Sequence, residues 1–365
     1  MSNKHLSHNQ MALQKFKKNF WGVLSFWFIV FLILISIFGY FIAPDASTNA
    51  NNGDVSLSTK PMGFEVEMLQ VPIKEKNNTF SNWFTGFEIT DQNIPILSYQ
   101  FKNDTLFYKE YHQDAALAQI KSIPVKAFHK TEAEIISENI FTKKYFLGTD
   151  NQGRDYLSRL IIGSRVSLAI GFVAVGISLV IGVFMGAIAG YFGGKVDAAV
   201  LWIINVIWSI PTLLLVIAIT LALGKGFWQV FIAVGLTMWV EVARVVRGQV
   251  MSIKQMQYVT AAKALGYSHT RIIFKHILPN SWAPVIVISA ANFASAILVE
   301  SGLSFLGLGA QVPIPSWGGM IKEHYNYIIL GKAYLALIPG IAMLLLVVAF
   351  MMIGNALRDA LDVKN

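Results

Sequence analysis

Residues 244–280 read RVVRGQVMSIKQMQYVTAAKALGYSHTRIIFKHILPN and lie between two long apolar runs. The stretch contains six Lys and Arg residues and no Asp or Glu. A loop between membrane spans with this bias faces the cytoplasm. Ala261 and Ala262 favour a helix and Gly266 permits a turn. Because Pro279 stops or redirects a helix, we predict a short helix, a turn and a second helix, small enough to enter a groove on another protein.

The composition is that of a multi-span membrane protein. Hydrophobic residues make up 55% of the chain and charged residues only 14%, and the mean hydropathy is +0.53. The net charge of +8 does not indicate nucleic-acid binding, because the basic residues flank apolar segments, as membrane orientation requires. With no cysteine, the chain has no disulfide, thiolate nucleophile or Cys-ligated metal site.

Six apolar segments are candidates for membrane helices, since crossing a bilayer takes about 20 apolar residues. We predict spans at residues 20–43, 166–190, 198–223, 227–243, 281–300 and 333–356. The first run follows a basic segment at 1–19 and is too long for a signal peptide, so we expect it to be retained. An even number of spans places both 1–19 and the tail at 358–365 in the cytoplasm.

Residues 44–145 change in character, because polar and charged residues dominate there. Period-two alternation predicts strands at 64–68 and 106–108, and 115–137 could include a helix. We therefore expect a small α+β domain inserted on the extracytoplasmic side, after the first helix.

The segment FLGTDNQGRDYLSRLIIGSRVSL, residues 146–168, precedes the second span. Its turn-forming and capping residues predict an interfacial helix that begins soon after Gly153. Two interpretations stay open: the charged residues pair with one another at the membrane surface, or they contact a substrate. The residues of this pre-helix motif are Gly148, Thr149, Asp150, Gly153, Arg154, Asp155 and Arg159.

Four residues are candidates for a pathway or gate: Pro211, Asn292, Glu300 and Trp317. Pro211 should kink the third span. Glu300 ends the fifth span and either faces a water-filled passage or reaches the interface. Residues 301–321 are rich in Gly and Pro and predict a re-entrant or surface element. In the fourth span, Glu241 and Arg244 are three residues apart and predict a local ion pair.

Three of these stretches together resemble the membrane permease subunits of bacterial ABC importers, in the dipeptide and oligopeptide branch. Residues 244–280 look like the EAA loop of that family, which docks as a coupling helix onto the ATP-hydrolysing subunit. Thr260 stands where the family usually carries Glu, which puts a charged contact in doubt. The matching residues of this coupling loop are Thr260, Ala261, Ala262, Gly266, Leu278, Pro279 and Asn280.

The resemblance covers residues 146–362 well and 15–43 loosely, and it implies an all-α polytopic protein with the type I importer permease fold. The permease core would be 146–357, with 44–145 as the insertion. It also implies the partners: a second, similar permease, two ATP-binding subunits and an extracytoplasmic solute-binding protein, in the bacterial cytoplasmic membrane. The implied substrates are peptides or, in close relatives, nickel complexes or other small solutes.

No Gly-x-x-x-x-Gly-Lys-Ser/Thr frame occurs, so we expect no enzyme activity, cofactor or metal in this subunit, with ATP and magnesium on the partner ATPase. A secondary transporter is the main rival. It often carries charges in mid-span, whereas the middles of five of the six spans have none, which counts against proton or sodium coupling. A sensor or assembly protein that works through its outer domain is a third possibility.

Overall fold

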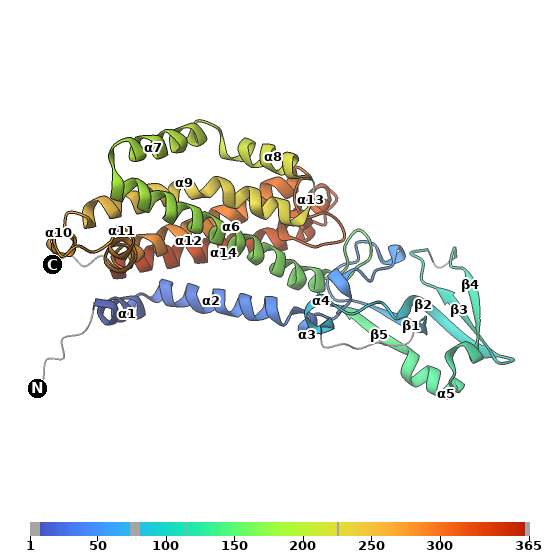
Figure 1. Ribbon diagram of the computed structural model, residues 1–365. Helices are drawn as coiled ribbons and strands as arrows, with labels where there is room; N and C mark the ends of the chain where they lie inside the picture. Colours follow the sequence, from blue (N-terminus) through green and yellow to red (C-terminus); the bar gives the residue numbers. More distant parts are fainter. Residues whose placement is uncertain (1–7, 74–80, 115, 225, 362–365) are drawn as a thin grey trace, which may run out of the picture.

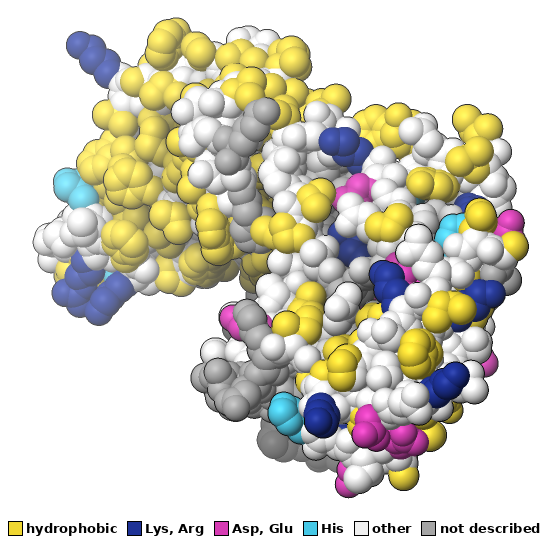
Figure 2. Space-filling view, turned by 90° about the vertical axis from the view of Figure 1, so that its right-hand side faces the viewer, with side chains coloured by type: hydrophobic (Ala, Val, Ile, Leu, Met, Phe, Trp, Pro, Cys, Tyr) yellow, Lys and Arg dark blue, Asp and Glu magenta, His cyan; other side chains and the backbone are white. Residues whose placement is uncertain are grey.

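The computed structural model describes residues 8–73, 81–114, 116–224 and 226–361. Its larger part is a bundle of long helices, and a five-stranded sheet lies at one end of that bundle (Figure 1). Figure 2, seen from the sheet end, shows hydrophobic side chains covering the bundle, whereas Lys, Arg, Asp and Glu side chains are scattered over the sheet region. The two parts match the predicted membrane region and inserted α+β domain.

Within the described residues, five helices are long and apolar enough to cross a membrane, and a bent pair raises the number to six if it counts as one span. The five are α2 (Phe20–Ile37), α6 (Tyr156–Phe192), α9 (Phe227–Ile253), α12 (Leu278–Phe305) and α14 (Tyr334–Leu361). The pair is α7 (Gly194–Trp208) and α8 (Thr212–Leu223), which meet at 92°. The predicted kink at Pro211 is therefore present, because proline cannot continue a helix from the residues before it.

The centre of the bundle is the contact of α6 with α9, which glycines on α6 make possible. A β-carbon on Gly186 would lie 2.4 Å from the carbonyl oxygen of Ala243, and one on Gly190 would lie 2.7 Å from that of Arg247. Small residues let two backbones approach closely where lipid gives no hydrophobic drive to association. The same contact explains why α9 extends to Ile253 rather than ending near 243, as the hydropathy alone predicted.

The segment before the second span differs from the prediction. In place of a separate interfacial helix, α6 is continuous over 37 residues. Asp155 caps its first turn by accepting a hydrogen bond from the Ser158 N–H at 2.7 Å. No proline interrupts the residues that follow, so the helix runs without a break from this cap into the membrane region.

The inserted domain is an antiparallel sheet with strand order β4-β3-β2-β1-β5. The strands are β1 (Phe64–Pro72), β2 (Asp91–Lys102), β3 (Thr105–Glu110), β4 (Ile120–Pro124) and β5 (Ile140–Tyr145). The two predicted strands are confirmed within β1 and β3. Helical turns at η3 (Val125–Phe128), α5 (Glu132–Glu134) and η4 (Ile135–Asn139) confirm helix in 115–137, and they pack Phe128 and Ile135 against the sheet.

The remaining elements connect these parts. They are α1 (His8–Lys18), α3 (Gly39–Ile42), η1 (Thr48–Ala50), η2 (Val55–Leu57), α4 (Asn82–Thr85), α10 (Gln257–Ala264), α11 (His269–Ile272), η5 (Ile273–Ile277), α13 (Trp317–His324) and η6 (Tyr325–Ile328). At the end of the bundle opposite the sheet lie α1, α10 and α11 (Figure 1). This arrangement agrees with a topology in which 8–19 and 244–280 share one side of the membrane and the insertion occupies the other. Residues 1–7 and 362–365 lie outside the described part.

Candidate functional site

The loop between α9 and α12 forms the predicted helix, turn and helix. After α10, Gly266 adopts φ +77°, a left-handed conformation that glycine takes without strain. Ser268 then caps α11 by accepting from the Arg271 N–H. Pro279 follows the π-helical turn η5 as the second residue of α12, and α11, η5 and α12 form one continuous helix from His269 to Phe305. The prediction that Pro279 stops or redirects a helix is therefore wrong.

Apolar contacts and polar bonds hold this helix pair against the end of the bundle. Val259, Ala262 and Ile272 are buried in a cluster with Val246 and Val250 of α9. The pair is also tied to α6, because the Tyr191 hydroxyl and the His269 Nδ1 are 2.8 Å apart. Lys254, at the end of α9, donates from its ammonium group to the Tyr191 carbonyl. The helix pair is thus a fixed part of the bundle.

The opposite face of the helix pair is exposed. Thr260, Ala261 and Gly266 all lie on it, and a β-carbon on Gly266 would meet no atom of the chain within 4 Å. Two large apolar side chains flank them: Leu265 is 72% exposed and Phe274 is 66% exposed. Small residues beside exposed apolar ones form a surface suited to another protein.

The other coupling-loop residues have different environments. Ala262 and Leu278 are buried in the chain's own core. Asn280 is exposed, and its amide donates to the His276 carbonyl at 2.8 Å and to the Tyr258 hydroxyl at 3.2 Å. Of the two neighbouring alanines, only Ala261 presents its methyl group to the exterior.

Three charged residues of the pre-helix motif, Asp150, Arg154 and Arg159, come together at the junction of bundle and insertion. The Arg154 Nε lies 2.5 Å from the Asp150 Oδ2, and the Arg159 Nε lies 3.4 Å from the same oxygen. Glu323 of α13 completes the cluster at 3.3 Å from the Arg154 Nη2. Sequence reasoning missed Glu323 because 169 residues separate it from Arg154 and no local pattern marks it.

The same motif packs closely against residues 45–60 and holds them at the start of α6. A β-carbon on Gly153 would lie 1.7 Å from the Asp54 carbonyl oxygen, and one on Gly148 would lie 2.3 Å from that of Lys60. Thr149 Oγ1 accepts from the Lys60 N–H at 2.8 Å. Of the two interpretations left open, the ion pairs of Asp150 with Arg154 and Arg159 favour mutual pairing over contact with a substrate.

Asp150, Glu323 and His324 place ligand atoms within 4.8 Å of one another, a spacing that a metal site would require. The two arginine side chains already engage both carboxylates. A divalent cation would meet two guanidinium groups, so the cluster fits an internal ion-pair network better than a metal site. His324 donates from Nδ1 to the Met320 carbonyl at 2.8 Å, and burial lowers its pKa below the ordinary value.

The pathway candidates are mostly internal to this chain. Glu300 is 1% exposed and accepts a hydrogen bond from the Ser304 hydroxyl at 2.6 Å, so it does not reach the interface. Trp317 is 2% exposed and donates from Nε1 to the Leu160 carbonyl at 3.0 Å. Asn292 is buried, and neither atom of its amide has a hydrogen-bond partner among the described residues. Pro211 alone is exposed, at the bend between α7 and α8.

The predicted ion pair between Glu241 and Arg244 is wrong. The guanidinium carbon of Arg244 lies 3.6 Å from the centroid of the Trp208 ring instead. Among the described residues, no base forms an ion pair with Glu241. The Trp208 ring of α7 holds Arg244 by a cation–π interaction. The spacing of residues within α9 gives no sign of this partner, because it lies on another helix.

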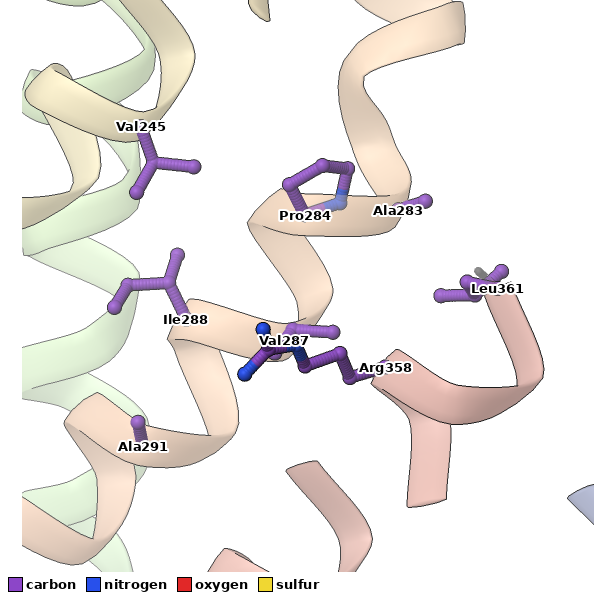
Figure 3. A pocket seen from close by; sticks show the side chains of 8 residues that line it. All are labelled: Val245, Ala283, Pro284, Val287, Ile288, Ala291, Arg358 and Leu361. Atoms are coloured by element: carbon purple, nitrogen blue, oxygen red, sulfur yellow. The ribbon is translucent and has the colours of Figure 1, made fainter. Parts of the chain in front are cut away.

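A cavity of about 440 Å³ opens between α9, α12 and α14. Figure 3 shows that Val245, Pro284 and Ile288 form apolar walls and that the Arg358 side chain extends from α14 toward α12. With one cation and otherwise apolar lining, this cavity favours an apolar group over a polar solute.

Comparison with known proteins identifies the family. Residues 182–364, half of the chain, match the family model described as binding-protein-dependent transport system inner membrane component, and residues 7–61 match the N-terminal TM domain of oligopeptide transport permease C. The dipeptide transport system permease protein DppC of Alkalihalophilus pseudofirmus is 42% identical over 221 residues, which cover 60% of this chain and 72% of that protein.

The oligopeptide transport system permease protein OppC of Bacillus subtilis is 37% identical over 223 residues, covering 61% of this chain and 73% of that protein. The solved inward-facing MetNI methionine ABC transporter is 19% identical, with a TM-score of 0.48, covering 57% of this chain and 98% of that one. Since the family model spans half of the sequence and the DppC and OppC permeases match over 72% and 73% of their own length, the chain belongs to the family of binding-protein-dependent transport system inner membrane components.

Proposed function

We propose that this chain is the membrane-spanning permease subunit of an ATP-driven importer of peptides. The observation that carries the proposal is the exposed helix pair α10–α11, fixed to the bundle at the end opposite the insertion. The named relatives, which transport dipeptides and oligopeptides, support peptides as the substrate class.

In this proposal the chain works with a second permease, two ATP-binding subunits and an extracytoplasmic solute-binding protein. ATP and magnesium bind to the ATP-binding subunits, and this subunit holds no cofactor. Closure of those subunits moves the surface formed by Thr260, Ala261, Leu265 and Gly266. Because the helix pair is bonded to α6 and packed on α9, its displacement tilts both helices and moves the bundle between inward-open and outward-open states.

Uptake by reconstituted proteoliposomes tests the proposal. The chain is assembled with its candidate partner subunits, and import of alanine peptides of two to six residues is measured with and without ATP. We expect import that requires ATP, the ATP-binding subunits and the binding protein. Import by this chain without those subunits, driven by a proton or sodium gradient, would identify a secondary transporter instead. Import of nickel but of no peptide would overturn the substrate class.

Orientation is tested separately. Because the chain contains no cysteine, single substitutions give specific labelling sites. We propose that both termini and the helix pair face the cytoplasm, in the cytoplasmic membrane. An impermeant thiol reagent added to spheroplasts should then label Lys102→Cys in the insertion, and it should label Thr260→Cys only after lysis. Labelling in the reverse order would contradict this topology.

A further inference from the structure

A small pocket with both polar and apolar lining lies at the bend between α7 and α8, where both pack near α9 and α12. Its volume is about 200 Å³. Thr212, Thr237, Glu241 and Ser295 supply its polar groups, and Trp208 is part of its wall. Thr212, Glu241 and Ser295 are exposed on the surface of the single chain.

Glu241 is the unusual member of this lining, because it is the one Asp, Glu, Lys or Arg residue in the predicted span 227–243, near the inner end of that span. A carboxylate at that depth is costly in contact with lipid and therefore faces water, a ligand or another protein. Its exposure means that the other side chains of this chain do not bury it.

The nearest cation on the same helix does not neutralise this carboxylate. Arg244, one turn further along α9, is held over the Trp208 ring at 3.6 Å. Within the described ranges, no lysine, arginine or histidine comes within ion-pair distance of Glu241. The stacked arginine thus leaves a negative charge open to the pocket.

Among the other polar groups, Thr237 adds an acceptor rather than a donor. Thr237 already donates its hydroxyl hydrogen to the Val234 carbonyl at 2.8 Å, so its oxygen faces any ligand as an acceptor. The Glu241 carboxylate and the Thr237 hydroxyl oxygen are both acceptors. They suit a positively charged group with several N–H donors, such as an ammonium ion. Thr212 and Ser295 add exposed hydroxyls, each of which can donate or accept a hydrogen bond.

We propose that this pocket binds the α-ammonium group of the transported peptide, with Glu241 as its anionic partner and Thr237 as a second acceptor. The inference rests on the proposed function, since it takes a peptide with a free amino group as the solute. Glu241 is then a specificity-determining residue on the pathway. A basic side chain of the second permease subunit is the competing occupant, and the test separates the two.

The test uses the assembled transporter in proteoliposomes with saturating binding protein. Uptake of alanine peptides of two to six residues is compared with that of their N-acetyl forms, which lack the ammonium charge. Glu241→Gln should lower uptake of the free peptides by about 10-fold or more, the factor expected for loss of a charge-assisted hydrogen bond. Uptake of the acetylated peptides should change less than about twofold. Glu241→Asp, which keeps the carboxylate, should retain most of the free-peptide uptake.

Each other outcome overturns the inference. An equal loss of uptake for free and acetylated peptides in Glu241→Gln would show that Glu241 has a structural role. No loss of uptake would show that Glu241 does not lie on the pathway. If Glu241→Gln instead prevents assembly of the two permeases on gel filtration, the carboxylate pairs with the partner subunit. If the wild type imports no acetylated peptide, the comparison is made between the two variants. An equal loss of free-peptide uptake in Glu241→Asp and in Glu241→Gln would then contradict the proposal. Absence of ATP-dependent peptide uptake by the wild type would refute the proposed function instead.

Discussion

Arg154 and Asp150 form a buried ion pair, with the Arg154 Nε 2.5 Å from the Asp150 Oδ2, at the place where the insertion joins the bundle. The same guanidinium donates to the Asn51 side chain at 3.0 Å and to Glu323 at 3.3 Å. One arginine therefore joins the segment before the sheet, the start of α6 and the helix α13. A charge buried at such a junction needs all its partners, because removal of one leaves the others unpaired.

The first prediction concerns this pair. Asp150→Asn should destabilise the chain by about 3–5 kcal/mol, the range for breaking a buried ion pair by removing one partner. Thermal unfolding of the detergent-solubilised protein measures the loss. Lys144→Gln is the control, because the Lys144–Glu65 pair at 2.8 Å is half exposed on both sides and should contribute less than about 1 kcal/mol. Equal effects from the two variants would contradict a structural role for the buried pair.

The second prediction concerns the exposed face of α10. Ala261→Trp should abolish ATP-dependent import, because the indole ring would prevent close approach of the ATP-binding subunit. The fold should tolerate the change, since Ala261 is exposed and contributes nothing to the core. Ala261→Ser is the matched control and should transport at the wild-type rate. Uptake and co-purification of the ATP-binding subunit are measured together, and normal binding by the Trp variant would show that α10 is not the contact.

The third prediction is a pH dependence at His324. Burial favours its neutral form and lowers its pKa from the ordinary value of 6.5, although the hydrogen bond to Met320 and the charges of Asp150 and Glu323 oppose the shift. The unfolded chain therefore binds more protons than the folded chain as the pH falls below about 6.5. Stability is retained above that pH and is lost progressively as the pH falls toward the lowered pKa.

Thermal midpoints measured between pH 7.5 and pH 5 should reveal this loss. His324→Asn does not titrate in this range, and its amide resembles the Nδ1–H that bonds to Met320, so its midpoint should vary less with pH. Arg159 also faces the ring and lowers its pKa, but it stays charged over the whole range and adds no slope. If the thermal midpoint of His324→Asn varied with pH as strongly as that of the wild type, His324 would not be the cause of the pH dependence.

Much of this fold was predictable because hydropathy and turn chemistry are local properties. The spans, the break at Pro211 and the turn at Gly266 all follow from short windows of sequence. The helix boundaries were less accurate: α9 continues beyond its apolar part because Val246 and Val250 pack against other helices. That packing depends on residues distant in the chain.

The polar sites show the same limit more clearly. The motif before α6 was recognisable as a unit, yet its partners Asn51 and Glu323 lie 103 and 169 residues from Arg154. In the same way, helical spacing placed Arg244 beside Glu241, but an aromatic ring from another helix holds the arginine. Local spacing indicates only the partners that are near in sequence, whereas the tertiary fold brings together partners that are far apart in the chain.

The last prediction concerns the insertion, for which we propose a role in docking the binding protein or the partner subunit. The Gly63 N–H bonds to the Tyr145 carbonyl at 2.9 Å and approaches that of Phe146 at 3.3 Å, so the sheet enters and leaves the structure at neighbouring points. Replacing residues 64–145 by a short Gly-Ser linker should remove the sheet and keep the clamped segment 45–60. The bundle should still insert and bind the ATP-binding subunits.

Association with the binding protein should weaken in this shortened chain, and surface plasmon resonance of the assembled complex would measure it. Point variants make the test more specific. Leu117, which precedes the edge strand β4, and Ile120, the first residue of β4, are both exposed. Leu117→Ser with Ile120→Ser should reproduce part of the loss if these side chains form the contact. The control pair Lys121→Gln and Glu110→Gln removes an exposed ion pair on the same sheet and should leave association unchanged. Import by the shortened chain with wild-type affinity and rate would show that the sheet has no part in docking.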